Sequence, residues 1–199
     1  ESAAGDVVKI LLSGTGADEI FAGYYDHYLY FLAEQSDLSR YSEMLVEWRN
    51  RSGRWINNPL LRDPNKFRSP DFRGSHLYQG DIDFDKLLAT KKSHKGSIPQ
   101  RGTQRDRLRL RMQKELYAEV VPVILAADDA NCMRFSIENR SPFLDPDLIR
   151  VAQGLPDRYL LSKGYGKWIL REAFKHDLPK CVLFDDRKRG FNANIEEYI

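Results

Sequence analysis

Residues 7–24 decide the fold, and they read Val7-Val8-Lys9-Ile10-Leu11-Leu12-Ser13-Gly14-Thr15-Gly16-Ala17-Asp18-Glu19-Ile20-Phe21-Ala22-Gly23-Tyr24. An apolar, β-branched run comes first, a turn of small residues follows at 13–16, and a helical pattern begins at residue 17. A strand that leads through a glycine-rich turn into a helix brings exposed amides and the positive end of a helix dipole to one place. The stretch therefore predicts an anion site, although glycine-rich turns of this kind are often only tight turns.

Two carboxylates, Asp18 and Glu19, follow the turn directly. In the first turn of a helix they suit the helix dipole, but beside a bound phosphate they would repel it. A divalent cation between the carboxylate and the phosphate removes this conflict, as Mg²⁺ commonly does. The alternative is that both carboxylates only cap the helix.

The composition is that of an ordinary globular protein, with 199 residues, 42% apolar content, 30% charged residues and a net charge of +2. The charge gives no reason to expect a nucleic-acid or membrane partner, and the longest apolar run, at 120–127, is too short to span a bilayer. Residues 1–6 show no secretory signal, so we predict a cytoplasmic protein in which Cys132 and Cys181 are reduced. The four histidines are scattered and have no zinc-site spacing.

Downstream of residue 24 the pattern is mainly helical. Helices are expected at 17–35, 37–51, 83–90, 103–119, 120–134, 146–153 and 166–176, with an irregular connection at 52–81. Few other strands are evident, and a lone parallel strand cannot form a core. We therefore expect an α/β protein, predominantly helical, that is the later part of a larger parallel-sheet domain.

Two clusters allow a structural and a functional interpretation. Aromatic residues gather at 24–31, where a buried core is the first expectation and an adenine-stacking platform is the alternative. Basic residues gather at 101–114, on one side of the clearest helix. A solvated or subunit-facing surface is the first expectation there, which leaves a homodimer open. Nucleic-acid binding is the alternative, and no nucleic-acid motif accompanies the basic helix.

Two further segments combine charges with apolar residues or glycine. Glu138 and Arg140 stand in an apolar stretch before a proline turn, so we expect a structural ion pair, with a substrate-orienting pair as the alternative. Residues 187–189 are three consecutive cations before Gly190. Such a run can bind phosphate, but by itself it is typical of a solvated surface.

Four motifs in one order resemble the glutamine-hydrolysing asparagine synthetase family. Residues 13–24 resemble its Ser-Gly-Glu-Gly-Ala-Asp-Glu-Leu-Phe-Gly-Gly-Tyr motif, and residues 136–145 resemble its Ser-Val-Glu-x-Arg-x-Pro-Phe-Leu-Asp motif. Residues 166–171, with the Leu-Pro pair at 178–179, and residues 188–191 resemble the closing Lys-x-x-Leu-Arg, Leu-Pro and Lys-x-Gly-Phe elements. The four matches cover nearly the whole chain in the right order, so the resemblance is specific.

The resemblance implies a PP-loop ATP pyrophosphatase fold, which is adenine nucleotide α-hydrolase-like: a parallel sheet flanked by helices and followed by a mostly helical region. It implies ATP and Mg²⁺ as cofactors and adenylation of the side-chain carboxylate of aspartate, with release of pyrophosphate. Ammonia from glutamine, produced in a separate N-terminal glutaminase domain, would then attack the acyl adenylate. Glu138 and Arg140 would form part of the wall of the substrate site.

The resemblance also implies roles for residues at the nucleotide. Ser13, Gly14 and Gly16 would lie against the AMP moiety. Asp18 would hold Mg²⁺, which agrees with the conflict between carboxylate and phosphate described above. Lys188 would sit on the phosphates as a catalytic cation and stabilise the charge that develops on adenylation.

Two departures from the family pattern bear on the chemistry. Thr15 occupies the position of the family's glutamate between two glycines, which is linked to substrate activation, and a hydroxyl cannot act there as a general base near neutral pH. We therefore treat Thr15 as a candidate catalytic position, and aspartate or another carboxylate remains open as the substrate. The family's arginine two residues before the lysine is Asp186 here, with Arg187 shifted by one.

Two parts of the family pattern are not found in these 199 residues, namely a Ser-Gly-Gly-x-Asp-Ser pyrophosphate loop and a glutaminase domain with a catalytic N-terminal cysteine. Both would lie upstream of Glu1. We therefore interpret residues 1–199 as the carboxyl-terminal part of a synthetase domain and expect them not to adenylate a substrate alone. The alternative is a catalytically inactive, synthetase-like module that binds a partner.

Overall fold

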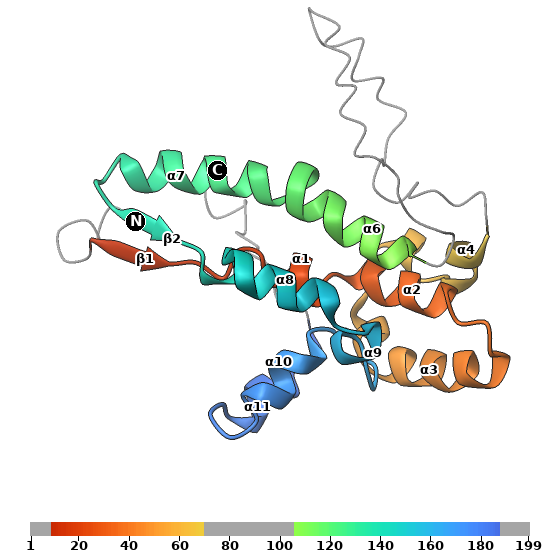
Figure 1. The fold of residues 1–199 in the computed structure, drawn as a ribbon. Helices are drawn as coiled ribbons and strands as arrows, with labels where there is room; N and C mark the ends of the chain where they lie inside the picture. The colour runs from red at the N-terminus through yellow and green to blue at the C-terminus, as the bar shows by residue number, and fades with distance from the viewer. Residues whose placement is uncertain (1–8, 70–105, 188–199) are drawn as a thin grey trace, which may run out of the picture.

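The computed structural model describes residues 9–69 and 106–187, which form a mostly helical protein with a small parallel sheet (Figure 1). This agrees with the predicted α/β class in which helices predominate. The elements are β1 (Ile10–Leu12), α1 (Ala17–Phe21), α2 (Tyr25–Ala33), α3 (Leu38–Asn50), η1 (Ser52–Trp55), η2 (Pro59–Leu61), α4 (Pro64–Arg68), α6 (Arg107–Lys114), the π-helical η3 (Glu115–Glu119), α7 (Val121–Met133), β2 (Glu138–Arg140), η4 (Pro142–Leu144), α8 (Pro146–Gly154), α9 (Asp157–Leu160), α10 (Trp168–Ala173) and α11 (Lys180–Leu183).

The sheet joins β1 to β2, a strand that the sequence pattern did not predict. The two strands are parallel, with Ile10 opposite Glu138 and Leu12 opposite Arg140. The Glu-Asn-Arg composition of β2 lacks the β-branched residues that normally indicate a strand, so its partner rather than its own propensity determines its conformation. Figure 1 shows the pair lying beside α7, away from the helices at the other end of the molecule.

The helix predicted at 17–35 is interrupted. Ala22 adopts a left-handed conformation (φ 57°) at the end of α1, and Tyr24 is extended before α2 begins. The amide of Gly23 donates to the carbonyl of Asp18 at 2.9 Å and closes α1 after five residues. The 3.6-residue period continued through this point because both helices contribute to one core, so periodicity alone concealed the break.

The other predicted helices are found with shifted ends. Asp37 accepts from the amides of two residues in the first turn and caps α3. α6, η3 and α7 lie end to end, since Pro122 falls in the first turn of α7, where no helical hydrogen bond needs its missing N–H. The helix at 166–176 is shorter than predicted because Lys167, with φ 52°, is its N-cap. The helix predicted at 83–90 lies outside the described residues.

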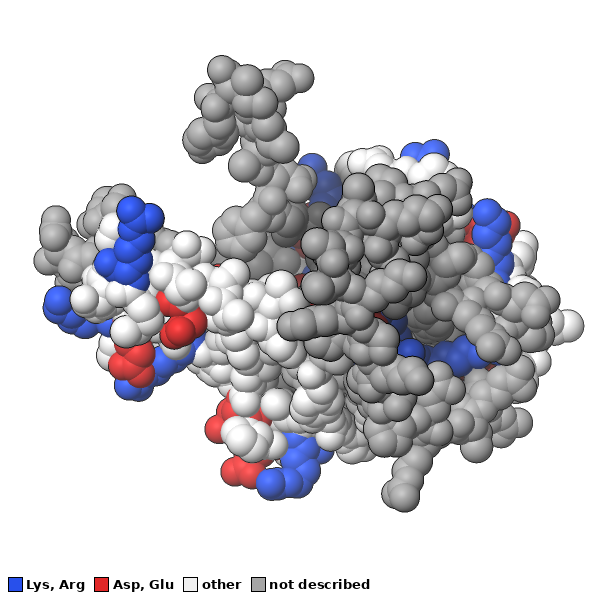
Figure 2. Space-filling model, turned by 90° about the horizontal axis from the view of Figure 1, so that it is seen from above, with Lys and Arg blue, Asp and Glu red and all other residues white. Residues whose placement is uncertain are grey.

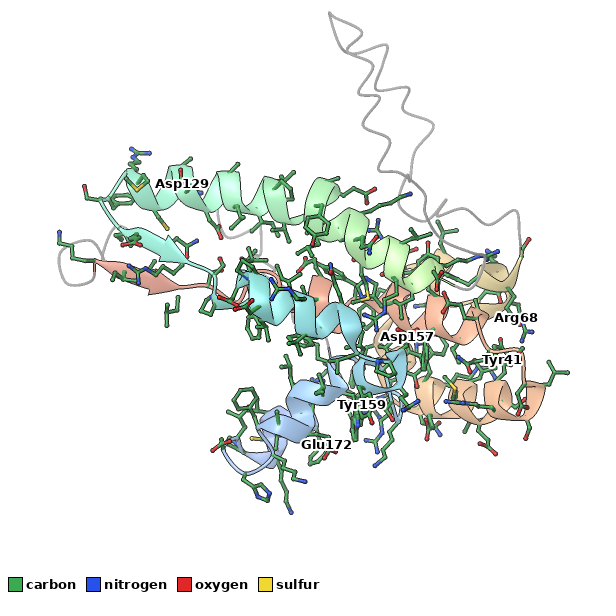
Figure 3. All side chains as sticks on the ribbon, in the orientation of Figure 1. Tyr41, Arg68, Asp129, Asp157, Tyr159 and Glu172 are labelled. Atoms are coloured by element: carbon green, nitrogen blue, oxygen red, sulfur yellow. The ribbon has the colours of Figure 1, made fainter. Side chains whose placement is uncertain are left out.

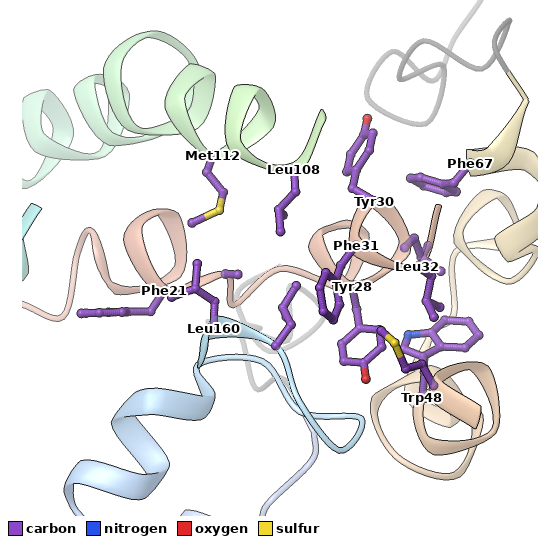
Figure 4. Close-up of a cluster of buried hydrophobic side chains, with 14 of the residues drawn as sticks. Phe21, Tyr28, Tyr30, Phe31, Leu32, Trp48, Phe67, Leu108, Met112 and Leu160 are labelled. Carbon is purple, nitrogen blue, oxygen red and sulfur yellow. The ribbon is translucent and has the colours of Figure 1, made fainter. Parts of the chain in front are cut away.

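The core is built around α2, whose residues from 26 to 32 are all buried. Tyr28, Tyr30 and Phe31 pack there against helices α3, α4 and α6 (Figure 4). The core interpretation of the aromatic cluster is therefore confirmed for these three residues. Tyr24 and Tyr25 are only partly buried.

Two basic residues of α6, Arg109 and Arg111, pair with neighbouring elements, contrary to the expected solvated or subunit-facing surface, whereas Arg101 and Arg105 lie outside the described residues. Arg111 is 9% exposed and contacts Asp26, Glu115 and Glu119. Arg109 donates to Asp157 at 2.6 Å, and Figure 3 shows Asp157 close to the body of the molecule. Acidic partners on α2, η3 and α9 attract these two guanidinium groups, so this side of the helix contacts the protein interior.

The surface seen from above has no basic patch among the side chains that the structure describes. Lys and Arg lie there interspersed with Asp and Glu (Figure 2). In the described ranges, no helix has both the length and the apolar character that crossing a membrane requires.

Candidate functional site

A cavity of about 770 Å³ opens between the α1–α2 connection, η1 and the α10–α11 segment. Its walls are largely aromatic and aliphatic, and its charged groups are Asp18, Lys167, Arg171 and the run 185–187. A concave apolar space of this size with a few convergent charges is typical of a small-molecule site. The remaining lining residues are Gly23, Tyr24, Tyr25, Tyr28, Ser52, Phe143, Leu161, Tyr165, Gly166, Leu170, Phe174, Leu178, Cys181, Val182 and Leu183.

Asp18 and Lys167 meet at this cavity. Lys167 Nζ lies 2.9 Å from Asp18 Oδ1, and both side chains are partly exposed. A Cβ atom at Gly23 would overlap with the Asp18 carboxylate, so the absence of a side chain at Gly23 leaves room for that carboxylate. The predicted metal ligand thus faces the cavity, with a lysine that sequence reasoning had not assigned to the site.

The loop that ends at Lys167 is fixed by backbone contacts. The amide of Lys167 donates to the carbonyl of Phe21 at 3.1 Å. A Cβ atom at Gly166 would lie 2.5 Å from the carbonyl oxygen of Ala22, so only glycine permits this close approach. The last residues of α1 therefore determine the position of the lysine.

The preceding turn, residues 162–165, is anchored on the other side. Lys163 and Gly164 both have positive φ, and the turn is closed by a short antiparallel bridge between Ser162 and Tyr165. The amide of Gly164 donates to the Tyr28 hydroxyl at 3.0 Å, and burial raises the pKa of that hydroxyl well above its usual range. Tyr28 is therefore a neutral, structural residue that connects the core to the Lys167 loop.

Glu19 does not share the site with Asp18. It is 3% exposed and accepts a hydrogen bond from the Tyr24 hydroxyl at 2.5 Å. Burial, together with this hydrogen bond, raises the pKa of Tyr24 far above its ordinary value. The two adjacent carboxylates of the motif thus have different roles, because Asp18 faces the cavity and Glu19 is buried, where it accepts the hydrogen bond from Tyr24.

The turn at 13–16 follows the carboxyl end of β1, as predicted. Ser13 and Thr15 share a 2.7 Å hydrogen bond between their hydroxyls, and the amide of Ser13 donates to the carbonyl of Arg140 at 2.8 Å. Gly16 has φ 98°, and a side chain there would overlap with Leu144. None of the four turn residues, Gly14 included, lines the cavity, although Asp18, two residues after the turn, does.

Glu138 and Arg140 form the expected ion pair, with 2.7 Å between Arg140 Nε and Glu138 Oε1. Each side chain is more than half exposed, however, so the expectation of apolar surroundings is wrong. In the register of the sheet both side chains stand on the face that carries Ile10 and Leu12. They do not line the cavity, and their predicted place in a substrate-site wall has no support among the described contacts.

Lys188, the predicted catalytic cation, lies outside the described residues. The three residues before it belong to the cavity wall. Arg171 fixes this wall, since it donates to the carbonyls of Leu183 and Asp185, and also to that of Gly166 at 3.0 Å. Lys167 and Arg171 both belong to the Lys-x-x-Leu-Arg resemblance, which was the available signal for these two residues.

A second charged cluster is buried between α2 and η3. Asp26, His27 and Glu115 offer ligand atoms within 4.8 Å of one another, a spacing that would suit a metal ion. The guanidinium of Arg111 already contacts both carboxylates, and His27 Nε2 lies 2.6 Å from Glu115. These internal partners make the cluster a structural ion network.

Comparison with known proteins gives one consistent result. The family described as asparagine synthase matches residues 2–198. A putative glutamine-hydrolysing asparagine synthetase of Mycobacterium tuberculosis is 29% identical over 220 residues, covering 96% of this chain and 31% of that protein. Glutamine-hydrolysing asparagine synthetase 1 of Bacillus subtilis is 36% identical over 76 residues, covering 38% of this chain and 12% of that protein. No solved structure matches significantly.

Proposed function

The chain belongs to the asparagine synthase family, and on that premise we propose that it is part of an ATP-dependent ligase that converts the side-chain carboxylate of aspartate to an amide. ATP activates the carboxylate, ammonia derived from glutamine forms the amide, and AMP and pyrophosphate are released. The chain spans about a third of the length of the Mycobacterium tuberculosis relative that it matches. A glutaminase domain elsewhere in the same protein is therefore part of the proposal.

The observation that supports this proposal best is the meeting of two family motifs at one cavity. Asp18 comes from the motif at 13–24 and Lys167 from the motif at 166–171, and their charged groups lie 2.9 Å apart on the cavity wall. A carboxylate and a cation side by side suit a metal-bound polyphosphate, since each can contact one component of that ligand.

The residues present fit a magnesium–nucleotide complex. Mg²⁺ is usually held by one or two carboxylates together with phosphate oxygens, and Asp18 supplies one such carboxylate. Lys167 pairs with Asp18 at 2.9 Å, and Mg²⁺ bound to Asp18 would release this lysine to contact a phosphate oxygen. Tyr24, Tyr25 and Tyr165 give the cavity the aromatic surface that a purine base favours. Bound ATP would supply the adenylyl group, and the side chains described here would orient it.

The turn at 13–16 keeps its proposed contact with AMP. It lies at the carboxyl ends of two parallel strands, which is where ligands bind in parallel α/β sheets. Thr15 is the weakest part of the aspartate proposal, because its hydroxyl is hydrogen-bonded to Ser13 and cannot serve as a base. This observation favours a second candidate function, a ligase of the same type that acts on another carboxylate.

The test is pyrophosphate release by the native, full-length polypeptide that contains this chain. Aspartate and a panel of other carboxylic acids are supplied with Mg-ATP and with glutamine or ammonia. Release with aspartate supports the first proposal, and release only with another acid supports the second. Nucleotide binding without any release indicates an inactive module, and neither binding nor release would overturn both proposals.

Asp18→Asn is the informative variant in this assay. Loss of the carboxylate removes the proposed magnesium ligand, so we expect kcat/KM to fall roughly a hundredfold. Asp129→Asn is the matched control, because Asp129 is exposed on α7, far from the cavity (Figure 3). Equal activity of the two variants would exclude Asp18 from the site. We also expect Lys188→Ala to abolish pyrophosphate release by the full-length protein. The isolated 199-residue chain should release no more pyrophosphate than its own Lys188→Ala variant.

A further inference from the structure

The wall formed by residues 185–187 is held from two directions. On one side, Arg171 donates to the backbone carbonyls of Leu183 and Asp185, while its guanidinium lies 4.7 Å from the centre of the Tyr165 ring. Burial lowers the pKa of Arg171, and carbonyl partners offset part of the cost of burying its charge. These contacts fix the backbone of the wall.

On the other side, Asp186 is bound to η1. Its carboxylate accepts from Arg54 Nη2 at 2.9 and 3.2 Å and from Trp55 Nε1 at 2.8 Å. The Asp186 side chain is only 6% exposed. The family pattern has an arginine at this position. The aspartate found here instead connects the cavity wall to η1 through its hydrogen bonds with Arg54 and Trp55.

Arg187 follows Asp186 in this fixed wall, and its guanidinium group has hydrogen-bond donors that the described residues do not use. Its guanidinium lies 5.1 Å from the centre of the Trp55 ring and its Nε is 3.4 Å from Asp185 Oδ1. No acceptor in 9–69 or 106–187 contacts its two terminal nitrogens, and the side chain is about half exposed at the cavity rim. Stacking on an aromatic ring holds a guanidinium flat while leaving its edge available.

The other two cations of the cavity are already engaged. Lys167 pairs with Asp18, and each nitrogen of the Arg171 guanidinium group donates to a backbone carbonyl. The negative charge nearest to Arg187 is Asp185, which occupies the Nε edge, whereas the charge of Asp186 is neutralised by Arg54. The two terminal guanidinium nitrogens of Arg187 are therefore the cationic donors in the described cavity wall that can bind an added anion without losing an existing partner.

We propose that Arg187 binds an anionic group of the ligand, and that Asp186 positions Arg187 through Arg54 and Trp55. The assignment rests on the proposed ligase function. The shared chemistry is a planar or tetrahedral oxyanion accepting two hydrogen bonds from one guanidinium. A phosphate of the nucleotide and a carboxylate of the acceptor acid are its two possible sources.

The experiment measures KM for ATP and KM for the acceptor acid by pyrophosphate release in the native, full-length polypeptide. Arg187→Ala should raise one of the two constants about tenfold, the size expected for one hydrogen bond between charged groups, with kcat within about twofold. An increase for ATP identifies the phosphate, and an increase for the acid identifies the carboxylate. Arg187→Lys should reverse only part of the increase in KM, because lysine keeps the positive charge but lacks the paired donors of a guanidinium group.

Asp186→Asn tests the positioning role. It should raise the same constant by a smaller factor and should add nothing when combined with Arg187→Ala, since both changes act through one guanidinium. A variant that merely weakens the fold would add its effect in both backgrounds. Arg158→Ala is the control, because Arg158 also stacks on an exposed aromatic ring, Tyr159, but does not line the cavity.

Two results would overturn the assignment. If the wild type is active and Arg187→Ala matches Arg158→Ala for both ligands, the role of Arg187 is wrong while the proposed function stands. If the wild-type protein neither binds ATP nor releases pyrophosphate, the proposed function fails and the assignment fails with it. Additive effects of the double variant would leave Arg187 as an anion contact but remove the role of Asp186.

Discussion

At the scale of single residues, the position of Asp18 depends on Gly23, which has only a hydrogen atom where any other residue has a Cβ. Gly23 leaves the space into which the carboxylate folds, and Lys167 approaches the same point from the opposite side. The constraint is steric rather than conformational, because the backbone of Gly23 does not have positive φ. A methyl group is the smallest change that can displace the carboxylate while leaving its charge intact.

We therefore predict that Gly23→Ala lowers activity in the pyrophosphate assay nearly as much as Asp18→Asn, with little loss of stability. Asp18 is a flexible, partly exposed side chain and can move aside, so the melting temperature should fall by no more than about 2–4 °C, equivalent to roughly 1 kcal/mol for a chain of this length. Gly154→Ala, where an added Cβ meets nothing within 4 Å, should leave activity unchanged. Full activity of Gly23→Ala would show that Asp18 does not need its present place.

At the scale of elements, α2 and α6 are joined by a carboxylate whose charge depends on pH. Glu34, just after α2, accepts from the amide of Leu108 in α6 at 3.0 Å. Burial raises the pKa of Glu34 to about 7 from an ordinary value of 4.5, although the hydrogen bond from Leu108 opposes the shift. Between these two pH values the folded chain holds a proton at Glu34 that the unfolded chain has lost.

The free energy of unfolding should therefore fall as the pH rises from about 4.5 to 7, with Glu34 contributing about 1–3 kcal/mol to the fall. Glu34→Gln, which is neutral at every pH, should remove this part of the pH dependence. Urea unfolding of both proteins at pH 5 and pH 8 measures the difference. Glu43→Gln, an exposed residue of α3, is the control and should follow the wild type.

The contact between α2, α6 and η3 has a second ionic component. Arg111 is the cation shared by Asp26, Glu115 and Glu119, and of these only Glu119 has substantial exposure. Arg111→Met should remove the cation that the buried carboxylates of Asp26 and Glu115 share and cost about 3–5 kcal/mol in urea unfolding. Arg150→Met, which breaks an exposed pair with Asp147, should cost less than about 1 kcal/mol. Equal losses for the two variants would mean that the network is as solvated as the surface pair.

At the scale of the whole molecule, the sheet exposes a face that parallel sheets normally cover. Ile10 is 44% exposed and Leu12 is 75% exposed, and both lie on the side of the sheet that carries Glu138 and Arg140. Because the matched relatives are about three times as long as the region they share with this chain, we expect further polypeptide to pack on this face in the native protein.

A cysteine reporter checks this expectation. In a Cys181→Ser background, Leu12→Cys should react with a maleimide at least roughly tenfold faster in the isolated chain than in the native, full-length protein. Val46→Cys, which replaces an exposed residue of α3, should react equally fast in both. Equal rates at position 12 would show that nothing covers the sheet.

The sequence predicted the parts of the fold that depend on local chemistry. The helix that begins near residue 37, the first strand and the core role of Tyr28 could be found because periodicity signals reside in neighbouring residues. β2 and the inward course of Arg111 could not, since each depends on a partner distant in the chain. For the site, the motif pointed correctly to Asp18, but only the folded backbone places Lys167 beside it.

The pairing of β1 with β2 also determines when the site can form during folding. Residues 10–12 pair with residues 138–140, so the chain must close a loop of more than a hundred residues before the sheet exists. Such non-local contacts form late, after the helices between them have gained local stability. The amide of Ser13 donates a hydrogen bond to the carbonyl of Arg140, so the turn at 13–16 is completed only at that stage. A nascent chain in which residue 140 has not yet been synthesised can therefore contain folded α2 and α3 while the turn at 13–16, the predicted anion site, is still incomplete.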